Sequence, residues 1–541
     1  MLARFEGATW NLSGAYGKTE VLPELWLCGQ VFSCEQALAA ADLLPLLTLA
    51  CQQNQLPEYL RSLNGFFSGV LLLDGQLFCF TDRTRSRPLF YGMDGAELLI
   101  SDDTGWLLER LPAAEPEPDS VAEFSFTGFI TGSATLHPGI YQLQAAELLQ
   151  WSLGQPPQRI IYDWYLHLNS QNTPESIQPW LEQLDQVTEK VVQRLIRYAN
   201  GRQIVLPLSG GYDSRALAMH FRRAGYPDVV CFTFGRPGSA EVALSRKVAS
   251  LAGYPWVCVT YSRQMWRELF QQPEFQRFLD FVHGLVSVPT VQVFPAIQQL
   301  VKNRQIDANA VIAPGHTGAF FSGALDDSGW CESHQVPKAL NAVLKKHYEH
   351  SREALPEAVR EKIVLQLETI ADEARRRQRL NVNSLAECWN YRERQAKFII
   401  NSNRYYDFFA LDWWMPLWDG DFMAFWQQVP YSLRRSKLLW KTYVNQLVSQ
   451  QSGNAEPLGH ANVKRYPWLT RLYSWFNYFL EDNHLYAIVP FKRWLAFKLR
   501  LSQERGTVFG TLAGYMVFRD KLRFDIKNTK SRKNMSKNAA M

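Results

Sequence analysis

The sequence lacks any run of 18 uninterrupted apolar residues, so no segment predicts a membrane-spanning helix. Its first residues, MLARFEGATWNLSG, include acidic and polar side chains where a secretory signal needs an apolar core. The eight cysteines are scattered, with no CxxC pair and no His/Cys cluster at zinc-ligand spacing. These absences argue against membrane, secreted disulfide-bonded and zinc-binding proteins, and they predict a reducing, cytoplasmic setting.

The chain also has little net charge. Its 57 Lys and Arg residues against 52 Asp and Glu give +5, which does not indicate a nucleic-acid partner. Part of the excess lies in residues 521–541, where Asp525 is the only acid, and such a tail is expected to be solvated and disordered. With 47% hydrophobic residues over 541 positions, the chain is predicted to be globular, with two or three domains.

Two patterns divide the chain. Residues 1–165 contain short strand-like runs, at 66–73, 76–82 and 139–144, separated by Gly, Asp, Asn and Pro turns, with a surface loop expected at 111–120. From residue 170 to 450, strands alternate with helices whose apolar residues recur three and four apart, and 340–450 is mainly helical. The predicted fold class is α/β, with a largely β first domain and a second domain built on a parallel sheet. Residues 451–541 are expected to form an aromatic-rich helical extension with a basic tail.

One loop carries the strongest signal for chemistry. In VLPLSGGYDSRAL, residues 205–217, a buried-type strand ends at a Gly-rich loop and a helix begins at once. Adjacent glycines let backbone N–H groups approach a ligand, and the helix N-terminus favours an anion. Ser209 and Ser214 offer hydroxyls to phosphate oxygens, whereas Asp213 suits Mg²⁺ that bridges phosphates. The alternative is a tight turn in which a Ser or Asp only caps the helix. The complete SGGxDS string after an apolar strand favours nucleotide binding.

PLSGGYDSR resembles the pyrophosphate loop of the ATP pyrophosphatase superfamily, and within it asparagine synthetase and β-lactam synthetase. The stretch 63–92, with Asp82-Arg83 and Pro88 to Tyr91, resembles the glutamine amidotransferase domain of that family. MPLWDGDF and the following RRSKLLWK resemble its Pro-Phe-Leu-Asp segment and its Lys-bearing helix. The resemblance covers about residues 1–450. It implies a degenerate first domain of the N-terminal-nucleophile hydrolase type, followed by an ATP pyrophosphatase domain.

The resemblance also implies an activity, in which ATP adenylates a substrate carboxylate, pyrophosphate leaves, and nitrogen then displaces AMP. The implied pyrophosphate and Mg²⁺ ligands are the loop residues Ser209, Gly210, Gly211, Asp213 and Ser214, with Asp213 on the metal.

Three further positions follow from the same resemblance. Phe234 and Gly235, at the end of the next strand, are expected beside the adenine. Lys437 is expected to stabilise the negative charge that develops on the phosphates. The alternative for Lys437 is an ordinary surface lysine in RRSK.

The first departure from the family concerns its glutaminase, which uses a cysteine exposed at the N-terminus as nucleophile. Here Leu2 stands at that position, and the nearest cysteines are Cys28 and Cys34. CGQVFS replaces the Asn-Gly-Glu-Ile-Tyr-Asn stretch that binds glutamine in the family. Glutamine hydrolysis is therefore not expected.

The second departure concerns a Gly-Asp-Gly-x-Asp-Glu-type loop, which completes the Mg²⁺ site in the family. Its counterpart here is VIAPGHTGAFFSGALDD. When Gly315 and Gly323 are aligned with the family's loop, Ala319 stands at the aspartate position. Asp326 or Asp327 would have to substitute for that carboxylate. His316 is either a phosphate or substrate contact or an ordinary loop histidine.

Two hypotheses follow. The first is an ATP-dependent amide-forming ligase that takes free ammonia, an amine, or ammonia from a partner glutaminase. The second is a catalytically impaired nucleotide-binding scaffold. Divergent relatives in surface-polysaccharide pathways suggest sugar acids as the small-molecule carboxylate substrate. The basic residues Arg392, Arg394, Lys397 and Arg404 either bind such an anion or form a solvated helix face. The C-terminal region either contacts a membrane surface or partner protein or packs on the core.

Overall fold

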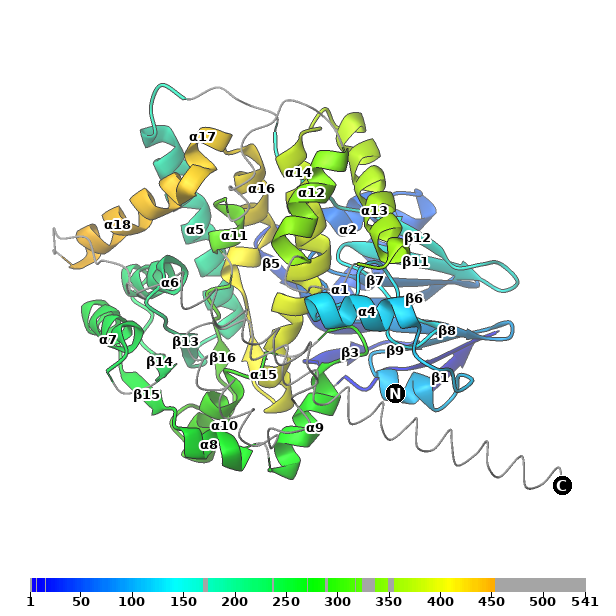
Figure 1. The fold of residues 1–541 in the computed structure, drawn as a ribbon, viewed down its shortest axis with the longest axis horizontal. Coiled ribbons are helices and arrows are strands. Elements are labelled where there is room, and N and C mark those ends of the chain that lie inside the picture. Colours follow the sequence, from blue (N-terminus) through cyan, green and yellow to red (C-terminus); the bar gives the residue numbers. More distant parts are fainter. Residues whose placement is uncertain are drawn as a thin grey trace, which may run out of the picture.

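The computed structural model describes residues 2–452, apart from Glu6, Ala15, 169–173, 236–237, Phe270, 288–289, Thr317, 324–335 and 349–354. Three β-sheets and the helices around them give an α/β fold, as the sequence predicted (Figure 1). The predicted extension at 451–541 lies outside the described residues beyond Ser452. The limits of the two domains stay a prediction.

Two sheets form from the first 161 residues. In hydrogen-bonded order, the first contains β1 (Leu2–Phe5), β2 (Ala8–Asn11), β9 (Glu97–Ser101), β8 (Phe90–Asp94) and β10 (Ile140–Gln142). The second contains β12 (Gln158–Ile161), β11 (Glu147–Ser152), β7 (Gln76–Thr81), β6 (Leu63–Leu73), β4 (Leu25–Ser33) and β3 (Thr19–Val21), with β5 (Gln36–Leu38) beside β4.

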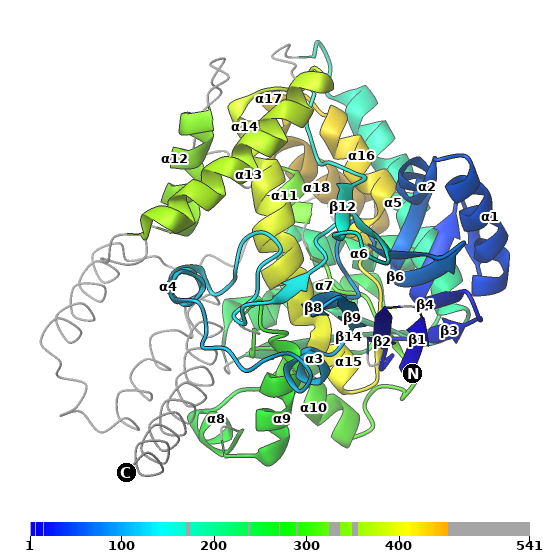
Figure 2. The same ribbon diagram turned by 90° about the vertical axis from the view of Figure 1, so that its right-hand side faces the viewer.

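A shared apolar core packs the two sheets together. Trp10 and Ile100 from the first sheet and Trp26, Val70 and Trp151 from the second belong to one buried cluster. The other face of the second sheet is covered by α1 (Ala40–Gln52) and α2 (Leu56–Ser62), as Figure 2 shows. Burial on both faces explains why β6 and β7 are almost continuously apolar rather than alternating.

The third sheet is parallel and has the order β15-β14-β13-β16-β17. Its strands are β13 (Ile204–Pro207), β14 (Val229–Gly235), β15 (Trp256–Thr260), β16 (Val311–Ile312) and β17 (Asp412–Trp413). The predicted alternation of strands and helices from 204 to 260 is confirmed. Because β13 is the central strand, the Gly-rich loop that follows it opens at the middle of the carboxyl edge, where ligands of such sheets bind.

The helices that pack around the parallel sheet and the chain segments after it are α5 (Gln178–Ala199), α6 (Tyr212–Arg223), α7 (Ala240–Ala252), α8 (Arg263–Leu269), α9 (Pro273–Val282), α10 (Phe294–Lys302), α11 (Gly318–Phe321), α15 (Arg404–Phe408), α16 (Gly420–Gln428), α17 (Tyr431–Arg434) and α18 (Leu438–Ser452). Helix α6 is buried along most of its length because α18 packs against it (Figure 1).

A second helical group contains α12 (Val336–His347), α13 (Glu357–Arg376), α14 (Val382–Asn390) and the ten-residue π-helical segment η2 (Tyr391–Ile400). Its apolar core includes Phe129 from the N-terminal region and Trp389 from α14. The shorter elements are α3 (Thr104–Leu108), α4 (Pro118–Thr127) and the 3₁₀ turns η3 (Asn401–Asn403), η4 (Pro416–Trp418) and η5 (Arg435–Lys437).

The loop expected at 111–120 is shorter than predicted. Helix α4 begins at Pro118, where a proline suits the first helical position because its missing N–H would have no helical partner. Leu111 at the other end is buried in a small cluster with Trp106 and Leu107. The Pro- and Glu-rich composition of 111–120 is typical of a loop, so it predicted neither the start of α4 nor the burial of Leu111.

A buried arginine connects the two halves of the structure. Arg194 of α5 donates to Asp419, to Asp421 (2.8 Å) and to Glu35 (2.7 Å) in the turn after β4. The Arg194 side chain is fully buried and that of Asp419 nearly so. Burial raises the pKa of Asp419, and the Arg194 charge opposes that rise.

We expect Arg194→Ala to destabilise the protein by roughly 3–5 kcal/mol, because it leaves the Asp419 carboxylate buried without its cation. Urea unfolding would measure the loss. Arg375→Ala is the control, since Arg375 and Asp372 form an exposed pair worth at most about 0.5 kcal/mol. Equal losses in the two variants would contradict this role of Arg194.

Candidate functional site

The Gly-rich loop lies between the central strand β13 and helix α6. Gly211 is the cap residue of α6, with φ −80° and ψ 166°, so the cap position has no side chain of its own to bond the first helical turn. The alternative that a Ser or Asp only caps this helix stays a prediction. The twelve-residue helix presents its N-terminal N–H groups at the carboxyl edge of the sheet, which favours an anion.

Short hydrogen bonds hold the loop in one shape. The Ser214 hydroxyl lies 3.1 Å from the Ser209 hydroxyl and accepts from the Ser209 N–H at 3.1 Å. The Gly211 N–H donates to the Ser209 hydroxyl at 3.1 Å, and Arg215 donates to the Gly210 carbonyl at 3.0 Å. The two serines thus face each other across the loop before any ligand is present.

Helix α11 and the residues before it approach the loop through glycines. A Cβ at Gly315 would lie 2.9 Å from the Ser214 backbone nitrogen. A Cβ at Gly318 would lie 2.9 Å from Asp213 Oδ1 and 3.1 Å from the Trp440 ring. Neither position leaves space for a side chain, so the glycine spacing of this segment reflects contact with the loop.

Asp213 is also bonded to α18. Its Oδ1 accepts from the Trp440 indole N–H at 2.7 Å. One turn further, the Tyr443 hydroxyl lies 2.6 Å from His220 Nε2 on α6. Two polar contacts therefore dock α18 on the helix that follows the loop.

Lys437 immediately precedes α18, in a turn of unusual conformation. Ser436 (φ 53°, ψ 20°) and Lys437 (φ 60°) are both left-handed, which costs an L-residue about 1–2 kcal/mol each. Burial lowers the pKa of the Lys437 ammonium, Asp213 opposes that shift, and Lys441 and Lys346 lower the pKa further. Lys437 thus lies within electrostatic reach of Asp213 and is only partly exposed, unlike an ordinary surface lysine.

Phe234 and Gly235 lie at the end of β14, beside β13 on the same edge of the sheet. The Phe234 ring stacks on Tyr261 with centroids 5.0 Å apart. The Gly235 carbonyl accepts from the Tyr261 N–H at 2.8 Å. The structure thus brings these two residues to the same edge as the Ser209–Ser214 loop, and their contact with adenine stays a prediction.

Ala319, which stands where the family has its aspartate, is in α11 next to Gly318, the glycine that approaches Asp213. Asp326 and Asp327 lie outside the described residues. Burial lowers the pKa of His316 to about 4, so this imidazole is neutral at pH 7 and brings no positive charge to a phosphate. Within the described ranges, no three His, Cys, Asp or Glu side chains gather at metal-ligand distances.

The basic residues of 392–404 do not form a solvated face or an open anion site. Arg392, Lys397 and Arg404 are buried, and Arg392 donates to the Ala145 carbonyl at 2.9 Å. Lys397 pairs with Glu393 and Arg404 with Asp407.

Arg394 is partly exposed, and its guanidinium carbon lies 5.6 Å from the centroid of the Phe398 ring. The hypothesis that these four residues receive an anionic substrate is therefore wrong for the three buried ones.

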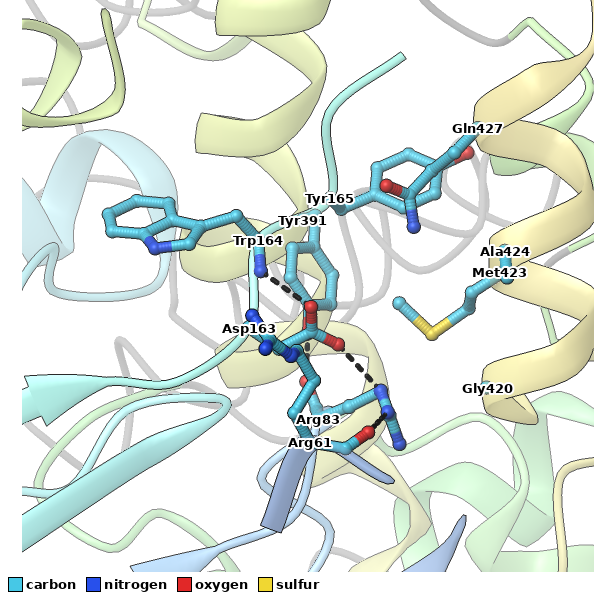
Figure 3. A pocket seen from close by; sticks show the side chains of 10 residues that line it. All are labelled: Arg61, Arg83, Asp163, Trp164, Tyr165, Tyr391, Gly420, Met423, Ala424 and Gln427. Atoms are coloured by element: carbon cyan, nitrogen blue, oxygen red, sulfur yellow. Dashed lines mark hydrogen bonds and ion pairs between the residues drawn. The ribbon is translucent and has the colours of Figure 1, made fainter. Parts of the chain in front are cut away.

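A cavity of about 160 Å³ lies elsewhere, between the N-terminal sheets, η2 and α16 (Figure 3). Arg83 and Asp163 form an ion pair in its wall, with Nε and Oδ2 2.6 Å apart. Tyr165, Tyr391 and Met423 also line it. None of the residues predicted from the sequence for the nucleotide site lines this cavity.

Comparison with known proteins supports part of the resemblance. A probable glutamine-hydrolysing asparagine synthetase of Acanthamoeba polyphaga mimivirus is 29% identical over 218 residues. The match covers 39% of this chain and 36% of that protein, so the chain spans about a third of the relative's length. No family model matches. The chain is thus asparagine synthetase-like in sequence, which supports that part of the resemblance rather than β-lactam synthetase.

Two solved structures align over about half of the chain. One is a glutamine phosphoribosylpyrophosphate amidotransferase from B. subtilis complexed with ADP and GMP, at 10% identity and a TM-score of 0.19, covering 55% of this chain and 62% of that one. The other is an allosteric regulatory enzyme of purine biosynthesis, at 10% identity and a TM-score of 0.18, covering 54% and 60%. These scores are too low to carry an argument.

The arrangement fits a nucleotide polyphosphate. A helix N-terminus, two facing serine hydroxyls and Lys437 are suited to phosphate oxygens. Asp213 is one carboxylate for Mg²⁺, an ion that usually takes one or two carboxylates together with substrate phosphates and water. Sequence reasoning missed Trp440, although its place three residues after Lys437, in the first turn of the Lys-bearing helix segment, was a usable signal.

We expect Gly323→Ala to destabilise the protein by about 3 kcal/mol, combining backbone strain with overpacking. Gly323 has φ +112°, and a Cβ there would overlap the Arg434 carbonyl oxygen. The matched control is Gly154→Ala, where φ is +78° and nothing lies within 4 Å, so only strain of about 1 kcal/mol applies. Thermal unfolding that places both variants at the same Tm would show that the contact with Arg434 is unimportant.

Proposed function

We propose that this protein is an ATP-dependent amide-forming ligase that adenylates a small-molecule carboxylate and releases pyrophosphate. The observation that carries the proposal is the SGGYDS loop at the carboxyl end of the central parallel strand, with Lys437 in electrostatic reach of Asp213. The sequence likeness to an asparagine synthetase supports the same reaction class. The loop and Lys437 come from segments more than two hundred residues apart in the sequence. Their approach in the structure favours a role in one common site over a coincidental contact.

In this reaction, a carboxylate oxygen of the substrate attacks the α-phosphorus of ATP, and the bond to the β-phosphate oxygen breaks. Ser209, Ser214 and the N–H groups at the start of α6 would bind the departing pyrophosphate. Lys437 would offset the negative charge that grows on it. Asp213 would hold Mg²⁺, which supplies charge neutralisation at the phosphates. A nitrogen nucleophile then attacks the acyl carbon, AMP leaves, and the nitrogen loses a proton.

The nitrogen donor would be ammonia, an amine, or ammonia from a partner glutaminase. Burial raises the pKa of Cys28 and of Cys51 to about 11, and raises that of Cys79 as well, so these thiols stay protonated at neutral pH. Cys34 lies in an exposed turn between β4 and β5. Cys28, Cys51 and Cys79 therefore do not match a thiolate poised for glutamine hydrolysis.

The carboxylate would be aspartate or a sugar acid of the kind used in surface-polysaccharide or small-metabolite synthesis. The structure gives the site one feature that bears on this choice. The last turn of helix α12 contains Lys345 and Lys346, and the Lys346 charge lowers the pKa of Lys437. A doubly anionic acceptor would suit these positive charges. Helices in the described part of the chain fall short of the length and apolar content that a bilayer crossing requires.

The test is release of pyrophosphate and AMP from ATP and Mg²⁺, with ammonia, across aspartate, uronic acids and nucleotide-sugar acids. We expect release to depend on one carboxylate, and Asp213→Ala and Lys437→Met to lower kcat by about 10²- to 10³-fold. Lys441→Met, one turn further along α18, is the matched control and should cost only a few-fold.

Two results would count against the ligase. ATP bound with no AMP formed on any acceptor would favour the nucleotide-binding scaffold, for which Ala319 at the family's aspartate position, together with the missing nucleophile, is the motivating observation. Absence of ATP binding would overturn both functions.

The pH dependence of ATP binding tests Lys437 directly. Burial lowers the pKa of Lys437 from its ordinary value near 10.5, so its charge is lost at a lower pH than that of an exposed lysine. ATP affinity should therefore fall as pH rises through this lowered pKa. Lys437→Arg keeps its charge throughout that range and should abolish the fall. Isothermal titration calorimetry would measure the ATP affinity of wild type and Lys437→Arg as a function of pH. Identical pH profiles of the affinity would exclude Lys437 as the titrating group.

A further inference from the structure

A buried ionic cluster lies just before the Lys437 turn. Arg434, the last residue of α17, donates from Nη1 to both Glu387 oxygens, at 2.8 and 3.1 Å. His167 Nε2 contacts the same carboxylate and lies 3.1 Å from Arg434 Nη1, while its Nδ1 lies 3.2 Å from the Trp426 carbonyl oxygen. The exposed fractions of Arg434, Glu387 and His167 are 3%, 4% and 1%.

The charges in this cluster favour one arrangement. Burial raises the pKa of Glu387, but Arg434 and His167 outweigh that effect and bring it to about 2. Burial and the Arg434 charge lower the pKa of His167. Glu387 is therefore a carboxylate at pH 7, and its ion pair with Arg434 fixes the Arg434 side chain.

The Arg434 backbone is fixed as well. Its carbonyl oxygen packs against Gly323, where even a methyl group would overlap it. The next fixed point along the chain is Trp440, bonded to Asp213 at 2.7 Å. The two left-handed residues, Ser436 and Lys437, lie between these anchors. Their conformation is unfavourable alone and persists because both ends of the turn are held.

We propose that Glu387 and His167 are positioning residues for Lys437. They hold the Arg434 guanidinium, and Arg434 holds the start of the turn that directs the Lys437 ammonium toward the loop. Neither residue lies in the loop or on α18. The contact between Lys437 and a phosphate rests on the proposed function. The positioning of Lys437 by the cluster does not depend on any ligand.

A merely structural role predicts a different result. If the cluster contributed only to folding stability, removing the Glu387 charge would lower the free energy of unfolding without changing the surroundings of Lys437. Glu393 provides the comparison, because its carboxylate is as deeply buried, lies only six residues later, and pairs with Lys397 while accepting from the Gly132 N–H at 2.8 Å.

The first experiment needs no nucleotide. Wild type, Glu387→Gln and Glu393→Gln are treated with limiting sulfo-N-hydroxysuccinimidyl acetate, and the acetylation rate of each lysine is measured by peptide mass spectrometry. We expect Glu387→Gln to raise the Lys437 rate about five-fold, because a loosened turn exposes the amine, and to leave Lys441 and Lys190 unchanged. Glu393→Gln should leave the Lys437 rate at the wild-type value. An unchanged Lys437 rate in folded Glu387→Gln protein would overturn the proposal.

The second experiment connects the cluster to turnover through a double-mutant cycle in the pyrophosphate-release assay. Glu387→Gln should lower kcat at least ten-fold with little change in KM for ATP, and should have no further effect when Lys437 is already Met. Additive losses would overturn the link between Glu387 and Lys437.

Failure of the two proposals can be told apart. If wild type releases no pyrophosphate, the proposed function fails, and the acetylation rates still decide the positioning role. If Glu387→Gln does not fold, His167→Gln replaces it, since that change leaves the Arg434–Glu387 ion pair in place. It should raise the Lys437 acetylation rate by a smaller factor, and no rise would overturn the proposal.

Discussion

The hydrogen bond between the Trp440 indole and the Asp213 carboxylate is the contact on which the candidate site depends. It joins the first turn of α6 to a helix that begins 226 residues later in the sequence, at Leu438. The His220–Tyr443 contact, on the same pair of helices, sets the direction in which α18 runs. Because Lys437 immediately precedes α18, these two contacts determine how far its ammonium stands from the loop. A site built in this way is only as well ordered as the packing between α6 and α18.

Segment 315–323 has the complementary role of filling the space around that contact. Its glycines touch the Ser214 backbone, the Asp213 carboxylate and the Arg434 carbonyl in turn. A segment that makes three such contacts with its backbone cannot also carry bulky side chains there. Gly318 is followed by two aromatic residues, Phe320 and Phe321. Both are buried, and they pack against Tyr165 and Trp418. The same short stretch therefore closes the loop on one side and anchors in the core on the other.

Local patterns were enough to predict the α/β class, the strands from 204 to 260 and the position of the Gly-rich loop at a strand end. They were not enough for contacts that join distant residues. Nothing in RRSKLLWK shows that Arg434 is buried against Glu387, or that Trp440 reaches Asp213, because both partners lie in other elements. The basic stretch around Arg392 misled for the same reason. Charge in a sequence does not reveal burial, and these cations are neutralised inside the core.

The long separation between the loop and α18 also has a consequence for synthesis of the chain on the ribosome. Strands β13, β14 and β15 and helix α6 are complete once residue 260 or so has been made, whereas Lys437 and Trp440 emerge close to the end of the described chain. Until then Asp213 lacks the Trp440 indole, and the loop lacks Lys437. A nascent chain or a fragment ending before α17 would thus contain the whole Gly-rich motif and still be unable to assemble the candidate site.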